Sequence, residues 1–162
     1  MNNPINAEDG LEEVFLSNGT ILFKEGESSK HFYIIRSGKV EVFKRNENGE
    51  EIPLALVEEG QSLGEFAMID QAPRSAWARC LTDVEAVKIN ETAYQYMLDK
   101  LPDWAFSMMQ GLISRIRTTN EILARNGIVD QELLRQIASM EFNGEFTSSV
   151  NIQIDDLETE ES

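Results

Sequence analysis

Gly64, Glu65, Arg74 and Ser75 are the residues whose types and spacing suggest chemistry; they stand in the stretch GEFAMIDQAPRSAWARC, residues 64–80. A glycine that opens a helical turn lets backbone N–H groups approach a ligand closely, and such donors favour an anion. An arginine ten residues further on can return to the same point and hold a phosphate with its planar guanidinium group. Because like charges repel, Glu65 would instead accept hydrogen bonds from a sugar hydroxyl. The combination predicts a small sugar-phosphate pocket.

A plainer interpretation of the same residues stays open. Glu65 and Arg74 could form an ordinary surface ion pair, which contributes only ~0–1 kcal/mol. Cys80 ends the stretch as the single cysteine, and His31 is the single histidine. In ARCLTD the cysteine is expected to be a buried core residue, and a nucleophilic pair formed with the distant His31 is disfavoured.

Composition and charge exclude several classes of protein. The 162 residues are enough for one domain, or one domain plus an extension. A formal charge of −15 argues against direct nucleic-acid binding and against an anionic membrane surface. The first residues show no secretory leader, and no segment approaches the ~20 apolar residues of a membrane helix. One cysteine cannot form an internal disulfide and fits a reducing cytoplasm, so we expect a cytoplasmic protein.

Period-two alternation between residues 20 and 90 predicts short strands. A strand is expected near residues 20–26, two more in HFYIIRSGKVEVFKR with a break at Ser37-Gly38, and two after the quoted stretch. Asn48-Gly49 predicts a hairpin turn, with the return strand in EIPLALVEEG. Short strands at this spacing predict a mainly β fold with flanking helices, an antiparallel jelly-roll β-barrel.

The period changes to that of helices after residue 90. NETAYQYMLDKL predicts a short helix with a cap at Asn90 or Thr92, and Pro102-Asp103 starts a long one. On the long helix a heptad seam is expected to pair two copies of the chain, although packing on the chain's own barrel is the alternative. The seam residues are Ala105, Met109, Leu112, Ile116, Thr119 and Leu123.

The stretch GEFAM…PRSAWARC resembles the phosphate-binding cassette of the cyclic nucleotide-binding domain family, and especially its bacterial catabolite activator branch. ILFKEGESSKHFYIIRSGKVEVFKRNENGEEI has the strand and glycine order of that family, and the resemblance covers residues 18–138. It implies a jelly-roll sensor domain with a long dimerisation helix, and it implies cAMP as the ligand, with cGMP as the alternative.

The resemblance also implies roles for individual residues. Glu65 would accept a hydrogen bond from the ribose 2′-hydroxyl, Arg74 would hold the cyclic phosphate, and Ser75 would add a hydroxyl contact. On the long helix, RIRTTNEIL would place Thr119 and Asn120 at the base, although Asn120 departs from the small hydroxyl residue of the activator. The other implied positions are Gly64, Phe66 and Ala67 for the turn amides, Val42 and Leu54 for the apolar wall, and Arg115 to hold Glu65.

Four segments are predicted: a short helical lead over 1–17, a barrel over 18–102, the long helix and its hinge continuation over 103–140, and an acidic tail over 141–162. Residues 136–162 contain seven acidic residues and no Lys or Arg, which disfavours a DNA-binding domain there. The tail is expected to be a disordered, solubilising segment, with addition as a β-strand to a partner's sheet as the alternative.

These observations predict a stand-alone receptor for cAMP that forms a homodimer and signals to an unidentified protein partner. No enzymatic activity and no cofactor are expected, because a metal-dependent cupin of similar fold would need several histidines. The alternatives are a dimeric scaffold that no longer responds to nucleotide, and a transcription regulator that acts through another DNA-binding protein.

Overall fold

The computed structural model describes residues 10–141 of the 162-residue chain. The predicted acidic tail beyond residue 141 therefore lies outside the described residues. The strands are β1 (Leu11–Leu16), β2 (Ile21–Phe23), β3 (His31–Ser37), β4 (Val40–Arg45), β5 (Glu51–Val57), β6 (Ser62–Leu63), β7 (Trp77–Cys80) and β8 (Val84–Asn90). The helices are α1 (Glu65–Ile69), α2 (Glu91–Leu98), α3 (Asp103–Asn126) and α4 (Gln131–Glu141).

The strands form two antiparallel four-stranded sheets, ordered β1-β8-β3-β6 and β2-β7-β4-β5. The main core lies between them and contains Ile35, Val40, Ala78 and Cys80, each at most 1% exposed. The β4–β5 connection carries the predicted turn, and Gly49 there has a φ of 80°, which favours glycine. The jelly-roll class predicted from the sequence is thus confirmed.

The predicted helical lead over residues 1–17 is wrong where the structure describes it. Leu11–Leu16 is strand β1, which pairs along its whole length with β8. Val14 and Leu16 pack against the core and Phe15 points outward, 73% exposed. This is the two-residue period of a half-buried strand. The barrel therefore begins before residue 18.

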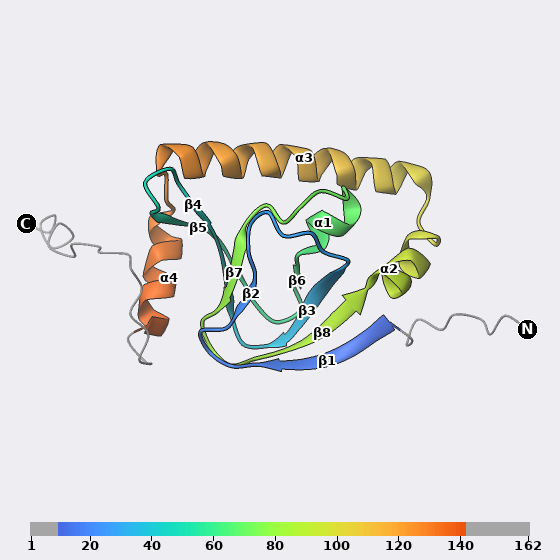
Figure 1. The fold of residues 1–162 in the computed structure, drawn as a ribbon, viewed down its shortest axis with the longest axis horizontal. Helices are drawn as coiled ribbons and strands as arrows, with labels where there is room; N and C mark the ends of the chain where they lie inside the picture. Colours follow the sequence, from blue (N-terminus) through green and yellow to red (C-terminus); the bar gives the residue numbers. More distant parts are fainter. Residues whose placement is uncertain (1–9, 142–162) are drawn as a thin grey trace, which may run out of the picture.

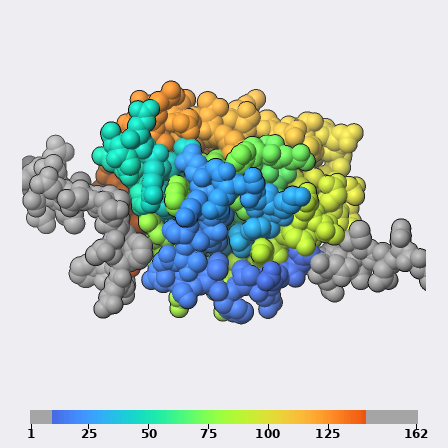
Figure 2. Space-filling model, in the orientation of Figure 1, coloured from blue at the N-terminus to red at the C-terminus, as the bar shows by residue number. Residues whose placement is uncertain are grey.

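The helices lie around the sheets (Figure 1). The long α3 runs along one side of the barrel, over α1 and the loops of β2 and β7, and Figure 2 shows it spanning that side from end to end. Its C-cap Gly127 is left-handed, and α4 then turns back beside β4 and β5. Ile137 of α4 is buried, so α4 covers edge strand β5.

Helix α2 begins where the sequence predicted, because the side chain of Asn90 accepts a hydrogen bond from the backbone N–H of Ala93 at 3.1 Å. None of the helices within residues 10–141 combines the length and the hydropathy that crossing a bilayer requires.

Half of the residues of the predicted seam on α3 are half-buried, and the other half are exposed to solvent. Ala105, Met109 and Leu123 are half-buried against the rest of the chain, whereas Leu112, Ile116 and Thr119 are exposed. The row that faces the barrel consists of Phe106, Ile113, Arg117, Asn120 and Ala124. Packing on the chain's own barrel thus accounts for half of the seam, and Trp104 and Met108 are further exposed apolar residues on the same helix.

Candidate functional site: a cavity between the barrel and the long helix

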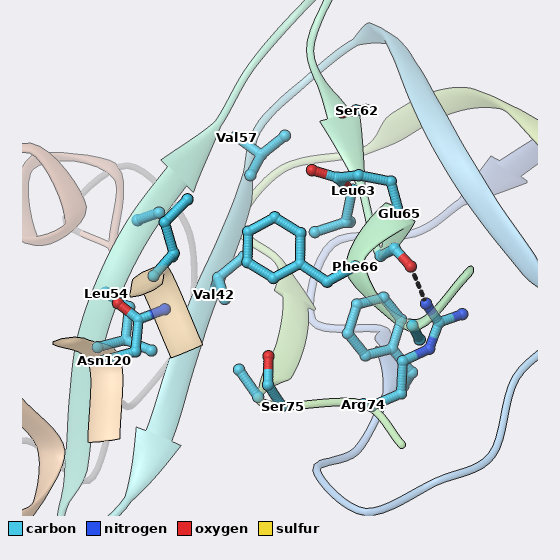
Figure 3. Close-up of a pocket in the computed structure, with 16 residues that line it drawn as sticks. Val42, Leu54, Val57, Ser62, Leu63, Glu65, Phe66, Arg74, Ser75 and Asn120 are labelled. Atoms are coloured by element: carbon cyan, nitrogen blue, oxygen red, sulfur yellow. Dashed lines mark hydrogen bonds between the residues drawn. The ribbon is translucent and has the colours of Figure 1, made fainter. Parts of the chain in front are cut away.

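A cavity of about 820 Å³, its open mouth included, lies between the β4–β5 wall, the α1 turn and α3. This volume is in the range of small-molecule sites. Figure 3 shows the residues that line it. They are Phe23, Val42, Leu54, Ala55, Val57, Ser62, Leu63, Gly64, Glu65, Phe66, Ala67, Arg74, Ser75, Ala76, Ile116 and Asn120.

Arg74 supplies a positive charge to the cavity wall. It is only 3% exposed. Its guanidinium donates to the carbonyl of Gly64 at 2.6 Å, to Oγ of Ser29 at 2.5 Å and to the carbonyl of His31 at 2.7 Å. It also lies 4.2 Å from the centre of the Phe23 ring. All three hydrogen-bond acceptors are neutral.

The charge of Arg74 has no direct ion-pair partner within residues 10–141. No carboxylate pairs with it there, and its Nε atom is buried with no hydrogen-bond partner among these residues. Burial lowers the pKa of Arg74, but an arginine remains charged at neutral pH. A buried, unpaired cation is costly, so the cavity wall is suited to receive an anion.

Gly64 has a φ of 85° and caps the N-terminus of α1. A Cβ atom at this position would lie 2.3 Å from Nη1 of Arg74. Only glycine therefore permits both the left-handed turn and the close approach of the guanidinium.

Glu65 lies half-buried at the cavity and makes no hydrogen bond or ion pair with its side chain among residues 10–141. The side chains of Glu65 and Arg74 point in different directions (Figure 3). The structure thus contradicts the alternative of an ordinary Glu65–Arg74 surface ion pair. The Glu65 carboxylate is left as a hydrogen-bond acceptor at the cavity wall.

The apolar wall comes from the β4–β5 hairpin. Val42 pairs with Ala55 and Phe43 pairs with Pro53, so Leu54 is the extra residue of a β-bulge. A bulge redirects side chains, and both Leu54 and Ala55 line the cavity. The ring of Phe66 projects between this wall and Arg74 (Figure 3).

Helix α3 supplies Ile116 and Asn120 to the cavity. Thr119 and Arg115, which the sequence analysis placed there, are exposed and do not line it. The hydroxyl of Thr119 donates to the carbonyl of Arg115 at 3.0 Å. Within residues 10–141 no ion pair joins Arg115 to Glu65. The single chain therefore brings together nine of the eleven predicted residues and leaves these two outside, one on either side of the barrel-facing Arg117.

Seven of the lining residues were missed by the sequence analysis: Phe23, Ala55, Val57, Ser62, Leu63, Ala76 and Ile116. Alternation along each strand could have indicated Val57, which is buried at the end of β5. Ala55 could not be found this way, because the bulge interrupts the alternation.

Comparison with known proteins agrees with this geometry. Residues 13–100 match the family model described as "Cyclic nucleotide-binding domain". The chain belongs to this family. It is 32% identical over 114 residues to the CRP-like cAMP-activated global transcriptional regulator of Mycobacterium tuberculosis, a match that covers 70% of this chain and 51% of the regulator. It is 34% identical to a cAMP-dependent protein kinase regulatory subunit of Blastocladiella emersonii, over 59% of this chain and 24% of the subunit.

Two solved structures are similar to the fold. The cAMP-bound form of the EAL enzyme Bd1971 has a TM-score of 0.64 and 30% identity, over 82% of this chain and 34% of that one. The Thermus thermophilus catabolite activator protein has a TM-score of 0.59 and 28% identity, over 72% of this chain and 55% of that one. The chain thus spans about half the length of the regulator and a third of the enzyme. It is a cyclic nucleotide-binding regulatory domain by family, and the absence of enzymatic activity remains an expectation.

Proposed function

We propose that the cavity binds a cyclic nucleotide, cAMP in preference to cGMP, and that the chain is a receptor for it. The observation that supports this most directly is Arg74, a buried cation at the cavity wall with neutral partners and an unpartnered Nε. A phosphate oxygen would supply the missing negative charge and accept charge-assisted hydrogen bonds, each worth roughly 1.5–3 kcal/mol.

The remaining walls suit the rest of a nucleotide. Glu65 offers a free carboxylate to a ribose hydroxyl, next to the turn that holds Arg74. Phe66, Val42 and Leu54 offer apolar surface for a purine base, and Asn120 offers an amide to its edge. Ser75 lies beside Arg74 at the phosphate end. That cAMP is named in the descriptions of the regulator and of the kinase subunit adds to the case for adenine, whereas the enzyme Bd1971 has been solved with cAMP and with cGMP.

The charge of −15 does not prevent anion binding. At physiological salt the Debye length is about 8 Å, so distant acidic groups are largely screened. Among the residues that line the cavity, the charged side chains are those of Arg74 and Glu65.

The output of the receptor is proposed to pass through α3 to a protein partner, with the chain acting as a homodimer. Trp104, Met108 and Leu112 form an exposed apolar row on α3, 67%, 54% and 50% exposed. Such a row is suited to pack against a second copy of the helix. A dimeric scaffold without a ligand is the second candidate, and the open cavity with its unpaired arginine favours the receptor over it.

Calorimetric titration with cAMP and with cGMP tests the proposal. Wild-type protein is expected to bind cAMP more tightly than cGMP, and Arg74→Ala is expected to bind neither while keeping its circular dichroism spectrum. Arg74→Lys should recover only part of the affinity, because an ammonium group cannot make the bidentate contact. Arg36→Ala, which removes an exposed arginine from β3, is the matched control. Unchanged affinity in a folded Arg74→Ala protein would contradict the proposal.

A further inference from the structure

The barrel-facing row of α3 contains an arginine that bonds to the loop just before Arg74. Nε of Arg117 lies 2.5 Å from Oδ2 of Asp70, and its Nη2 lies 3.0 Å from Oδ1, so the pair is bidentate. Nη1 of Arg117 also donates to the carbonyl of Pro73 at 3.3 Å. One side chain of α3 therefore contacts both ends of the loop 70–73.

A second connection holds the chain just after Arg74. Nζ of Lys44 donates to the carbonyl of Ser75 at 2.9 Å and pairs with Glu121 of α3 at 3.0 Å. It also pairs with Glu25, and only 8% of its side chain is exposed. Helix α3 is thus connected to the chain on both sides of Arg74, directly through Arg117 and indirectly, through Lys44 of β4, from Glu121.

Loop 70–73 depends on Asp70 for its shape. Asp70 caps the C-terminus of α1, and its Oδ1 accepts from the backbone N–H of Ala72 at 3.1 Å. The next residue, Gln71, has a φ of 53°, the only non-glycine residue with positive φ among residues 10–141. A positive φ at a residue other than glycine is strained, and it persists only where the surrounding structure fixes it. The hydrogen bonds of Arg117 to Asp70 and Pro73 fix the loop from outside.

We propose that Arg117 is a positioning residue: it fixes the phosphate-binding loop and α3 in one arrangement, so that Arg74 and Asn120 face the cavity together. The effect on affinity rests on the proposed function, whereas the effect on the ligand-free structure does not. Because coupling between sites is reciprocal, a nucleotide that fixes the loop also tightens the attachment of α3. Arg117, rather than the exposed Arg115, then links the cavity to the helix.

The first test compares hydrogen exchange in ligand-free wild type, Arg117→Gln, Asp70→Asn and a control, Arg125→Gln. Arg125 is an exposed arginine in the last turn of the same helix, so the control removes the same charge without touching the loop. The Arg117 and Asp70 variants should exchange faster in both segments 65–76 and 113–124. Exchange in the Arg117→Gln protein that equals that of Arg125→Gln would overturn the proposal.

The second test measures cAMP affinity for the same proteins and for the double variant. A positioning role predicts weaker binding, by about 5- to 50-fold, in both single variants and no further loss in the double variant. A purely electrostatic role predicts opposite effects, since Arg117→Gln removes a positive charge near an anion and Asp70→Asn removes a negative one. Tighter binding by Asp70→Asn, or additive losses, would overturn positioning. If wild type binds no cyclic nucleotide, the proposed function fails and the exchange data alone decide about Arg117.

Discussion

A Cβ atom on residue 64 would lie 2.3 Å from Nη1 of Arg74, so the absence of a side chain at Gly64 is what lets the guanidinium rest against the α1 turn. The carbonyl of the same glycine accepts the 2.6 Å hydrogen bond from that guanidinium. The two residues, ten apart in sequence, therefore form a single structural unit at the cavity wall.

Gly64→Ala is expected to weaken cAMP binding by roughly tenfold or more, because the methyl group must displace the guanidinium and the left-handed backbone adds ~1–2 kcal/mol of strain. Gly60→Ala is the matched control: Gly60 has a φ of +82° and no atom within 4 Å of an added Cβ. Both variants suffer the backbone strain, and only Gly64→Ala moves Arg74. Calorimetry measures the affinity of each variant for cAMP, and thermal unfolding measures the loss of stability that the backbone strain causes. Equal affinities of the two variants would contradict this account.

The exposed row on α3 predicts a dimer in solution. Replacing Met108 and Leu112 together by Asp would place charges in the helix pair and should yield monomers. The control replaces Ser107 and Ser114 by Asp, which adds the same charge to exposed positions of the same helix away from the row. Light scattering at tens of micromolar, with and without cAMP, measures the mass. A monomeric wild type under both conditions would contradict the prediction.

Much of the barrel and of the site could be predicted from the sequence because the signals are local. Alternation located the strands, Asn48-Gly49 located a turn, and the side chain of Asn90 capped α2 as expected. The cassette from Gly64 to Ser75 is also a local signal, since its residues lie within one helical turn and one loop, although distant residues such as Ser29 and Arg117 hold it in place.

The remaining features depend on packing between distant segments. The segment LEEVFL is a strand because its backbone pairs with β8 and its side chains Val14 and Leu16 pack against the core. The rotation of α3 decided that Asn120 and Arg117 face the barrel while Thr119 and Arg115 do not. A heptad pattern gives the row of apolar residues but not which protein surface covers it.

Cys80 was expected to be a core residue, and this is confirmed, because it is 1% exposed in the main core. Burial, with a smaller contribution from Asp83, raises the pKa of its thiol to about 11. The thiolate is the reactive form, so native protein at neutral pH should not react with a thiol reagent, whereas protein unfolded in guanidinium chloride should report one thiol. Rapid labelling of the native protein would contradict this prediction.

His31 predicts a pH dependence of stability. Its ring lies between Oγ of Ser29, 3.3 Å from Nδ1, and the Tyr33 hydroxyl, 3.1 Å from Nε2. Burial lowers the pKa of His31 below its ordinary 6.5, the positive charges of Lys88 and Arg74 lower it further, and Glu12 opposes them.

Around and below pH 6.5 the unfolded chain therefore binds more protons at His31 than the folded chain does. The free energy of unfolding must then fall as the pH is lowered through this range. The His31→Gln variant lacks the titrating imidazole but keeps all the carboxylates. The free energy of unfolding, measured in urea, should therefore fall more for wild type than for the variant between about pH 7.5 and about pH 5.5, so that the difference between them shrinks. A difference that stays constant or grows on acidification would show that His31 is not the group that titrates.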